Sequence, residues 1–107
     1  MGASHELIHG VADLRRVLSR AVPPVLVSAP GAAGYQGIGW WLALLRLARA
    51  EFPAVAFEAV LDCGNAPGLA LAAIRSGVPA VRVKAPPQAL SALDEIARAA
   101  GCRLYGE

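Results

Sequence analysis

The sequence predicts an α/β domain: a three-layer α/β/α sandwich with a mostly parallel sheet of four or five strands, built from (βα)n repeats. Three stretches lead to this prediction, because in each an apolar run is followed by a Gly/Pro-rich turn and then by a helical pattern. The apolar runs are PVLVSA at 24–29, AVAFEAVLD at 54–62 and PAVRVKA at 79–85. Strands that alternate with helices of about ten to fifteen residues are typical of βαβ units and a parallel sheet.

The start of the chain fits two alternatives. If the alternation begins at once, residues 6–10 (ELIHG) form a short strand and residues 11–21 form the first helix. A continuous helix from Glu6 to Ala21 also places apolar residues at the helical period, but Gly10 in its middle costs about 1 kcal/mol relative to alanine. We favour the strand and keep the helix as the alternative.

Residues 5–9 read HELIH and match H-E-x-x-H. In that motif two histidines one helical turn apart hold Zn²⁺ and the glutamate is the general base. In a strand, however, His5 and His9 lie about 13 Å apart at about 3.3 Å per residue, which is too far for bonds of about 2 Å to one zinc ion. The chain has no third histidine. We therefore interpret the match as accidental and expect no metal and no other cofactor.

The run at 24–29 is followed by a glycine-rich loop and a long apolar helix. Its VLV centre is apolar on both faces, which predicts a strand in the middle of the sheet. Only Arg46, Arg49 and Glu51 interrupt the apolar surface of the helix that begins near residue 38. Two interpretations stay open: the helix is deeply covered within the domain, or its tryptophan face lies in a homo-oligomer interface.

The later helices have clear boundary signals. Asn65 is expected to cap a helix that has Pro67 in its first turn, and Gly77 is expected to end it. The last helix is expected to open at Pro87 and to close at Gly101. Backbone N–H and C=O groups at helix ends lack partners within the helix, and these residue types either supply a partner or have no N–H that needs one. They therefore predict where each helix begins and ends.

The later strands differ in how they meet solvent. The run at 54–62 is nearly all apolar, with Glu58 as its exception. In AVRVK the valines alternate with Arg82 and Lys84, so one face of this strand is expected near solvent or at a subunit contact. A last strand at 102–106 completes a sheet of the Rossmann- or flavodoxin-like kind.

Composition restricts the classes of function. The 107 residues are expected to form one α/β domain over positions 1–107. With 56% hydrophobic and only 17% charged residues, the chain is expected to share surface with copies of itself in a homo-oligomer. The net charge of +2 is mild and no basic cluster is interleaved with aromatic residues, so we expect no nucleic-acid partner.

Two features concern location. Residues 21–45 carry no charge, but they contain three prolines and four glycines, and their dense apolar piece IGWWLALL is far shorter than the ~20 residues of a membrane span. We therefore expect no membrane partner. The N-terminus lacks an apolar signal core and the two cysteines lack CxxC spacing, so a cytoplasmic protein with reduced thiols is expected.

A ligand site is expected at the carboxyl edge of the sheet, where open parallel sheets bind their ligands. The loop at 28–37 is glycine-rich and leads into a helix, so its backbone N–H groups suit an anion. It lacks the spacing of a Walker A or a G-x-G-x-x-G loop, and a tight turn that lets helix and sheet approach is the alternative. The ligand-binding candidates are Ser28, Gly31, Gly34, Tyr35, Gln36, Asp62, Asn65 and Lys84.

Three residues are weak candidates for catalysis. Asp62 ranks first as a carboxylate at a strand end, Lys84 ranks second as a cation that neutralises an anionic ligand or pairs with Asp62, and Cys63 supplies a thiol. Each also has an ordinary alternative, such as a lysine that points to water or a cysteine that fills an apolar gap. A concave pocket that joins Ser28, Tyr35, Asp62 and Lys84 is the structural test of the site.

These observations predict a small cytoplasmic binding or regulatory module with an anionic small-molecule site at the carboxyl edge. The first alternative is a small enzyme that uses Asp62 and Lys84. The second is an oligomeric protein-interaction domain whose interface is the helix carrying Trp40 and Trp41. The sequence names no substrate and no reaction, so the three classes have to be separated by the structure.

Overall fold

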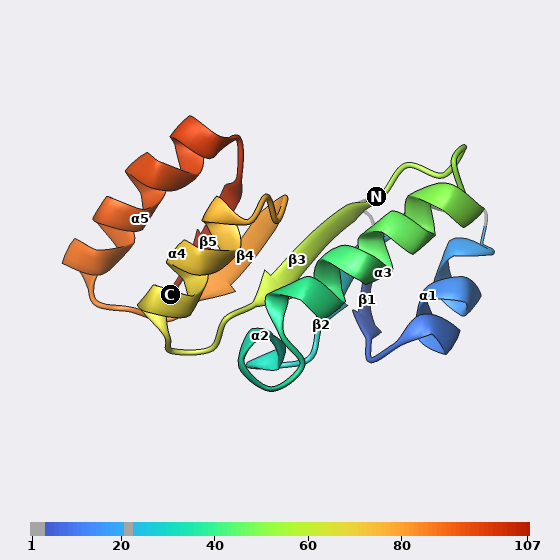
Figure 1. Cartoon of the computed structure of the whole chain (residues 1–107), viewed down its shortest axis with the longest axis horizontal. Coiled ribbons are helices and arrows are strands. Elements are labelled where there is room, and N and C mark those ends of the chain that lie inside the picture. Colours follow the sequence, from blue (N-terminus) through green and yellow to red (C-terminus); the bar gives the residue numbers. More distant parts are fainter. Residues whose placement is uncertain (1–3, 21–22) are drawn as a thin grey trace.

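A computed structural model describes residues 4–20 and 23–107 as five strands and five helices (Figure 1). The strands are β1 (His5–Ile8), β2 (Val25–Ser28), β3 (Glu58–Asp62), β4 (Ala80–Val83) and β5 (Arg103–Gly106). The helices are α1 (Val11–Leu18), α2 (Ala32–Tyr35), α3 (Ile38–Glu51), α4 (Pro67–Arg75) and α5 (Pro87–Ala100). Each pair of neighbouring strands is parallel. The predicted α/β class, with a mostly parallel sheet of five strands, is confirmed.

The strands follow one another in the sheet in sequence order, β1-β2-β3-β4-β5. Parallel strands joined in this order by right-handed crossovers have all their connecting helices on the same face. The contacts agree with this rule, since α1 packs on α3 and α4 packs on both α2 and α5. Arg15 of α1 and Glu51 of α3 also form a bidentate ion pair with N–O distances of 2.9 and 2.8 Å. The described helices therefore form a single layer.

The molecule is correspondingly flat. Its extents are 40 × 30 × 20 Å, and the shortest matches one sheet plus one helix layer of about 10 Å each. Figure 1, viewed along that shortest axis, shows α3 and α4 in front of the strands. The sandwich differs from the predicted three layers in that its described helices lie on one face of the sheet. The reason is the consecutive strand order, because helices on both faces require the order to reverse within the sheet.

The two faces of the sheet have separate apolar clusters. Leu26, Leu61 and Val81 point toward the helices, are 0% exposed and belong to the main core. On the opposite side the strands carry a second, smaller cluster that contains only strand residues. Its members are Val25, Val27, Val60 and Ala80. We call this side, on which no described helix packs, the uncovered face.

β2 is interior, although it is not the middle strand. All four of its residues are buried, as the apolar VLV centre predicts. β1 and β3 flank it, and the middle position of the sheet belongs to β3. The apolar run therefore predicted correctly that β2 is an interior strand, but its predicted place in the middle of the sheet was wrong. An apolar run indicates burial on both faces and does not indicate which strands lie beside it.

The predicted boundaries of the later helices hold with one exception. Pro67 and Pro87 stand in the first turns of α4 and α5. Gly77 and Gly101 follow the ends of these helices with φ angles of 91° and 71°, in the left-handed region where glycine is preferred. The exception is Asn65: the residue in the N-cap position of α4 is Ala66, and no side chain caps it.

The strand interpretation of the first segment is confirmed for residues His5–Ile8. β1 pairs with β2, and α1 follows after Gly10. The carboxylate Oδ2 of Asp13 accepts the backbone N–H of His9 at 2.8 Å and so stabilises the start of the helix. The helix ends at Leu18, and the expected helical residue Ala21 lies outside the described residues.

Trp41 belongs to the core and Trp40 to its edge. Trp41 is 0% exposed and is the largest fully buried side chain, whereas Trp40 is partly buried against the core. Their ring centroids are 5.7 Å apart. The covered-helix interpretation of α3 is therefore confirmed for Trp41, and an interface made by the Trp41 face is ruled out because that face packs inside the domain.

None of the helices within residues 4–20 and 23–107 is both long enough and apolar enough to cross a membrane.

Candidate functional site

Asp62 links the loops that follow β2 and β3. Its Oδ1 atom accepts the backbone N–H of Gly31 at 2.9 Å and that of Gly64 at 2.8 Å. Its own backbone N–H donates to Oγ of Ser28 at 2.8 Å. Both glycines have positive φ angles, of 69° and 59°, and a Cβ on Gly64 would lie 3.6 Å from the Cα of Gly31. The first-ranked candidate thus holds two closely approaching loops together.

This network takes Ser28 out of the candidate site. Ser28 is 1% exposed, and its hydroxyl accepts the N–H of Asp62. Tyr35, at the end of α2, is 65% exposed. The pocket expected to join both residues with Asp62 and Lys84 is therefore not formed as predicted, because the carboxyl end of β2 is closed against the loop after β3.

A smaller pocket does open at this edge. It has a volume of about 180 Å³ and lies at the carboxyl ends of β3 and β4. The residues that line it are Asp62, Gly64, Asn65, Arg82, Lys84 and Glu107. Three of the predicted candidates, Asp62, Asn65 and Lys84, are thus brought together. We call this the carboxyl-edge pocket.

The glycine-rich loop after β2 lies outside the lining of the carboxyl-edge pocket. Within it α2 forms one helical turn from Ala32 to Tyr35, where the sequence predicted a loop. Gly34 is exposed, and a Cβ on it would lie 3.7 Å from Cδ2 of Leu69 in α4, an ordinary contact distance. Gln36 donates from Nε2 to the backbone oxygen of His9 at 3.4 Å. The interpretation of this loop as a close turn between helix and sheet fits these contacts better than the anion loop.

Asn65 and Lys84 keep side chains that a ligand can reach. Asn65 is exposed, and the expected capping bond to α4 is not made. Lys84 is exposed at the end of β4, and its backbone N–H donates to the oxygen of Gly64 at 2.8 Å. The backbone bond fixes where the lysine leaves the sheet while the ammonium group stays accessible.

Sequence reasoning missed Arg82 and Glu107 as lining residues. Arg82 is the register partner of Asp62 across β3 and β4, so both side chains leave the sheet on the same side. The alternation in AVRVK predicted correctly that Arg82 leaves the core. The pairing with Asp62 was not readable, because register depends on which strand lies beside β4.

Cys63 is a buried thiol that is poorly suited to catalysis. It is 2% exposed. Burial, together with the negative charge of Asp62, raises the pKa of its thiol to about 11. Because the thiolate is the nucleophilic form, Cys63 is held in its unreactive state at neutral pH. The interpretation of this residue as a small apolar filler fits these properties.

The raised pKa of Cys63 predicts a loss of stability in alkali. Folding favours the protonated thiol, so this contribution is complete below the unfolded pKa of about 8.5 and is lost as the pH rises toward 11. We expect the free energy of unfolding to fall by about 2–3 kcal/mol over this range. Urea denaturation at pH 8, 9, 10 and 11 measures it, and Cys63→Ala should show a shallower fall. An equally steep fall in Cys63→Ala would assign the effect to other groups.

The HELIH motif carries no metal proposal. β1 is a strand that begins at His5 and ends at Ile8, directly before His9, and at about 3.3 Å per residue this places the two histidines too far apart for one ion. In the part of the chain that the structure describes, no group of three or more His, Cys, Asp or Glu side chains is arranged to hold a metal.

In comparisons with known proteins, no family model matches the chain and no curated protein matches it significantly.

Proposed function

We propose that the protein is a binding module for a small anionic molecule at the carboxyl-edge pocket. One observation carries the proposal: the strand register brings the cation Arg82 beside Asp62, and Lys84 leaves the same strand two residues later. Among the described residues neither cation has an ion-pair partner. Both are therefore available to a carboxylate or phosphate.

Of the other groups of the pocket, Asp62 and Asn65 support an anion over a cation, whereas the carboxylate of Glu107 opposes one. Oδ1 of Asp62 already accepts two backbone N–H groups, so part of its negative charge is compensated within the protein. The pocket also reaches Asn65, two residues before the start of α4, where the helix dipole favours negative charge. Asn65, freed from the expected capping role, adds an amide that can donate to the same ligand.

A binding role is better supported than the enzymatic alternative with Asp62 and Lys84. An acid–base residue has to reach the reacting atoms, whereas Asp62 is oriented by the two loops that it joins. Cys63, the remaining catalytic candidate, is buried and protonated. The enzyme therefore stays the second choice for this pocket.

The test is a titration with inorganic phosphate and malonate followed by NMR of the backbone amides. We expect the largest shifts at Gly64 and Asn65, and a dissociation constant that rises about ten-fold in Lys84→Gln and in Arg82→Gln. Arg75→Gln is the matched control, because it removes an exposed arginine from the far end of α4. Wild-type affinity in both pocket variants, or no shifts in the wild type, would refute the proposal.

A second candidate role is self-association through the uncovered face. The observation that favours it is the single helix layer, because all-parallel sheets are ordinarily covered on both faces. The occupant we propose is a second copy of this chain, in agreement with its high hydrophobic and low charged content. Leu7, 46% exposed and in register with Val27, extends the apolar centre of that face toward the edge.

Light scattering tests this role. We expect a mass of at least 22 kDa, twice the 11.0 kDa of the chain, and a return to the monomer in Leu7→Lys. Val11→Lys is the control, since Val11 is 37% exposed but lies on α1, away from the uncovered face. A monomeric wild type at ~0.5 mM, a concentration that saturates interfaces of micromolar affinity, would rule out the dimer.

We also retain the cytoplasm as the proposed location. Cys63 and Cys102 are both free and buried, which suits a reducing compartment.

A further inference from the structure

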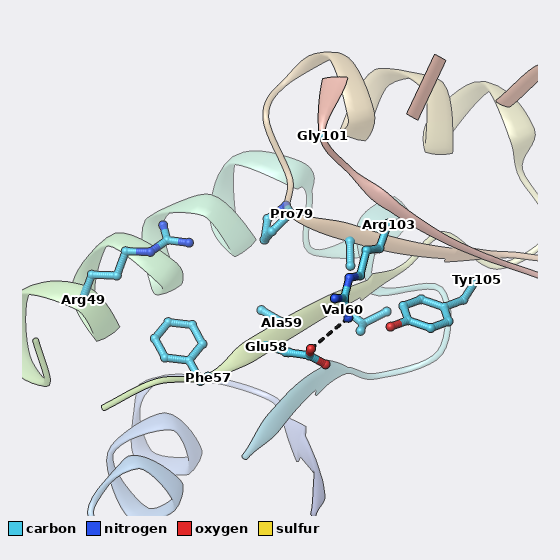
Figure 2. Close-up of a pocket in the computed structure, with 10 residues that line it drawn as sticks. Arg49, Phe57, Glu58, Ala59, Val60, Pro79, Gly101, Arg103 and Tyr105 are labelled. Carbon is cyan, nitrogen blue, oxygen red and sulfur yellow. Dashed lines mark hydrogen bonds and ion pairs between the residues drawn. The ribbon is translucent and has the colours of Figure 1, made fainter. Parts of the chain in front are cut away.

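A second and larger cavity opens at the opposite edge of the sheet (Figure 2). Its volume is about 270 Å³. It lies at the amino ends of β3, β4 and β5 and continues onto the uncovered face. The residues that line it are Arg49, Phe57, Glu58, Ala59, Val60, Pro79, Ala80, Gly101, Arg103 and Tyr105. None of them belongs to the carboxyl-edge pocket, and we call this second cavity the amino-edge cavity.

The floor of the amino-edge cavity is apolar and its sides are aromatic. Val60 and Ala80 are 3% and 5% exposed and form the floor together with Pro79. Phe57, which directly precedes β3, and Tyr105 of β5 stand on two sides of it, as Figure 2 shows. A flat ring of moderate size suits this arrangement, because aromatic side chains pack on ring faces and edges.

The side chains that line the cavity carry more positive than negative charge. Nη1 of Arg103 and Oε1 of Glu58 are 2.9 Å apart, and this pair reaches across β4, which lies between β3 and β5. Arg49 extends from α3, with its guanidinium carbon 5.9 Å from the centroid of the Phe57 ring. Among the described residues no carboxylate pairs with Arg49. Two arginines thus face one glutamate.

We propose that the amino-edge cavity binds a single-ring aromatic carboxylate. The ring lies on the apolar floor against Phe57, on the Arg49 side of the Glu58–Arg103 pair, which stands between Phe57 and Tyr105 in Figure 2. The carboxylate is bound by the planar guanidinium of Arg49. Glu58 repels the carboxylate and so orients it away from the Arg103 side of the cavity. The volume lies just below the range of about 300–1,000 Å³ for drug-sized ligands, which limits the ligand to about one ring.

The probes are benzoate, its neutral counterpart benzamide, and phenyl phosphate, each titrated by NMR. We expect benzoate to shift the amides of Phe57, Ala80 and Tyr105, and benzamide to bind about ten-fold more weakly. Tighter binding of phenyl phosphate than of benzoate would overturn the assignment to a carboxylate. Equal binding of benzamide would overturn the role of charge.

Variants locate the binding group. Arg49→Gln is expected to weaken benzoate about ten-fold and to remove the difference between benzoate and benzamide. Arg46→Gln is the matched control, because it removes an exposed arginine from the same helix outside the cavity. Arg49 is itself exposed, so its variant should fold, and phosphate binding at the carboxyl-edge pocket should not change.

All titrations are repeated in Leu7→Lys, so that a second copy on the uncovered face cannot mask the cavity. Failure of benzoate to shift the three amides in both backgrounds would refute the proposal. Equal benzoate affinity in the wild type and Arg49→Gln would do the same. Neither result bears on the carboxyl-edge pocket, which has its own probes and variants.

Discussion

Trp41→Ala is expected to lower the free energy of unfolding by about 3–5 kcal/mol. Trp41 is 0% exposed and is the largest side chain in the main core, so the substitution removes its apolar surface and leaves a cavity. Domains of this size have a total stability of about 5–15 kcal/mol, and the variant therefore loses much of its folded population. Guanidinium denaturation followed by far-UV circular dichroism measures the change without relying on tryptophan fluorescence.

Trp40→Ala is the matched control, because it makes the same chemical change one residue earlier in α3. Trp40 is only partly buried against the core, so its loss should cost less than half as much. If Trp40→Ala proved the more destabilising, the orientation of α3 described here would be wrong. A midpoint of unfolding that depended on protein concentration in the wild type, and lost this dependence in Trp40→Ala, would place Trp40 in an interface between copies.

Asp62→Ala is expected to cost about 2–4 kcal/mol of stability, although the residue lies at the edge of a pocket. The carboxylate accepts the N–H groups of Gly31 and Gly64, and hydrogen bonds to charged groups contribute about 1.5–3 kcal/mol each. We count less than the full sum because Asp62 is only partly buried. Asp62→Asn keeps an oxygen acceptor and should lose less. Urea denaturation at neutral pH gives both values.

Glu58→Ala is the control for Asp62→Ala, because it removes a carboxylate from the same strand that does not join two loops. Glu58 is exposed and pairs with Arg103 at the surface, so its loss should cost less than about 1 kcal/mol. Equal costs at the two positions would contradict the loop-joining role of Asp62. A binding defect in Asp62→Ala would reflect disturbed loops as much as a lost contact. Lys84 is therefore the sharper probe of the carboxyl-edge pocket.

The elements of the fold were predictable because their signals are local. The alternation of apolar runs with Gly/Pro turns predicted β2, β3 and β4, and glycines with positive φ angles end α4 and α5 as expected. α2 was missed because Gly34 stands inside a single helical turn, where glycine is disfavoured. Strand order was not predictable, since no local pattern says which strands become neighbours. The single layer of helices follows from that order.

The sequence predicted correctly at which edge of the sheet the candidate site lies, but it predicted only some of the residues that line it. Strand ends correctly located Asp62 and Lys84 at one edge. Arg82 joins them through its register with Asp62, which depends on tertiary structure. Ser28 was a reasonable polar candidate in the same position along its strand, but its hydroxyl is used inside the protein. The amino-edge cavity had no sequence signal, because its residues come from α3, from three strands and from the segments that precede these strands.

The consecutive strand order also allows the sheet to grow in the direction of synthesis. Paired residues such as His5 with Val25, Val25 with Glu58, Leu61 with Val81 and Ala80 with Arg103 are 20, 33, 20 and 23 positions apart. Each strand after the first therefore pairs with one that has already left the ribosome, and none has to wait for a later strand to be inserted beside it. The consecutive order keeps these separations short for a parallel sheet, which limits the loop-closure entropy that makes parallel pairing slow. The chain can thus add its βα units one by one, as stacked repeat proteins do.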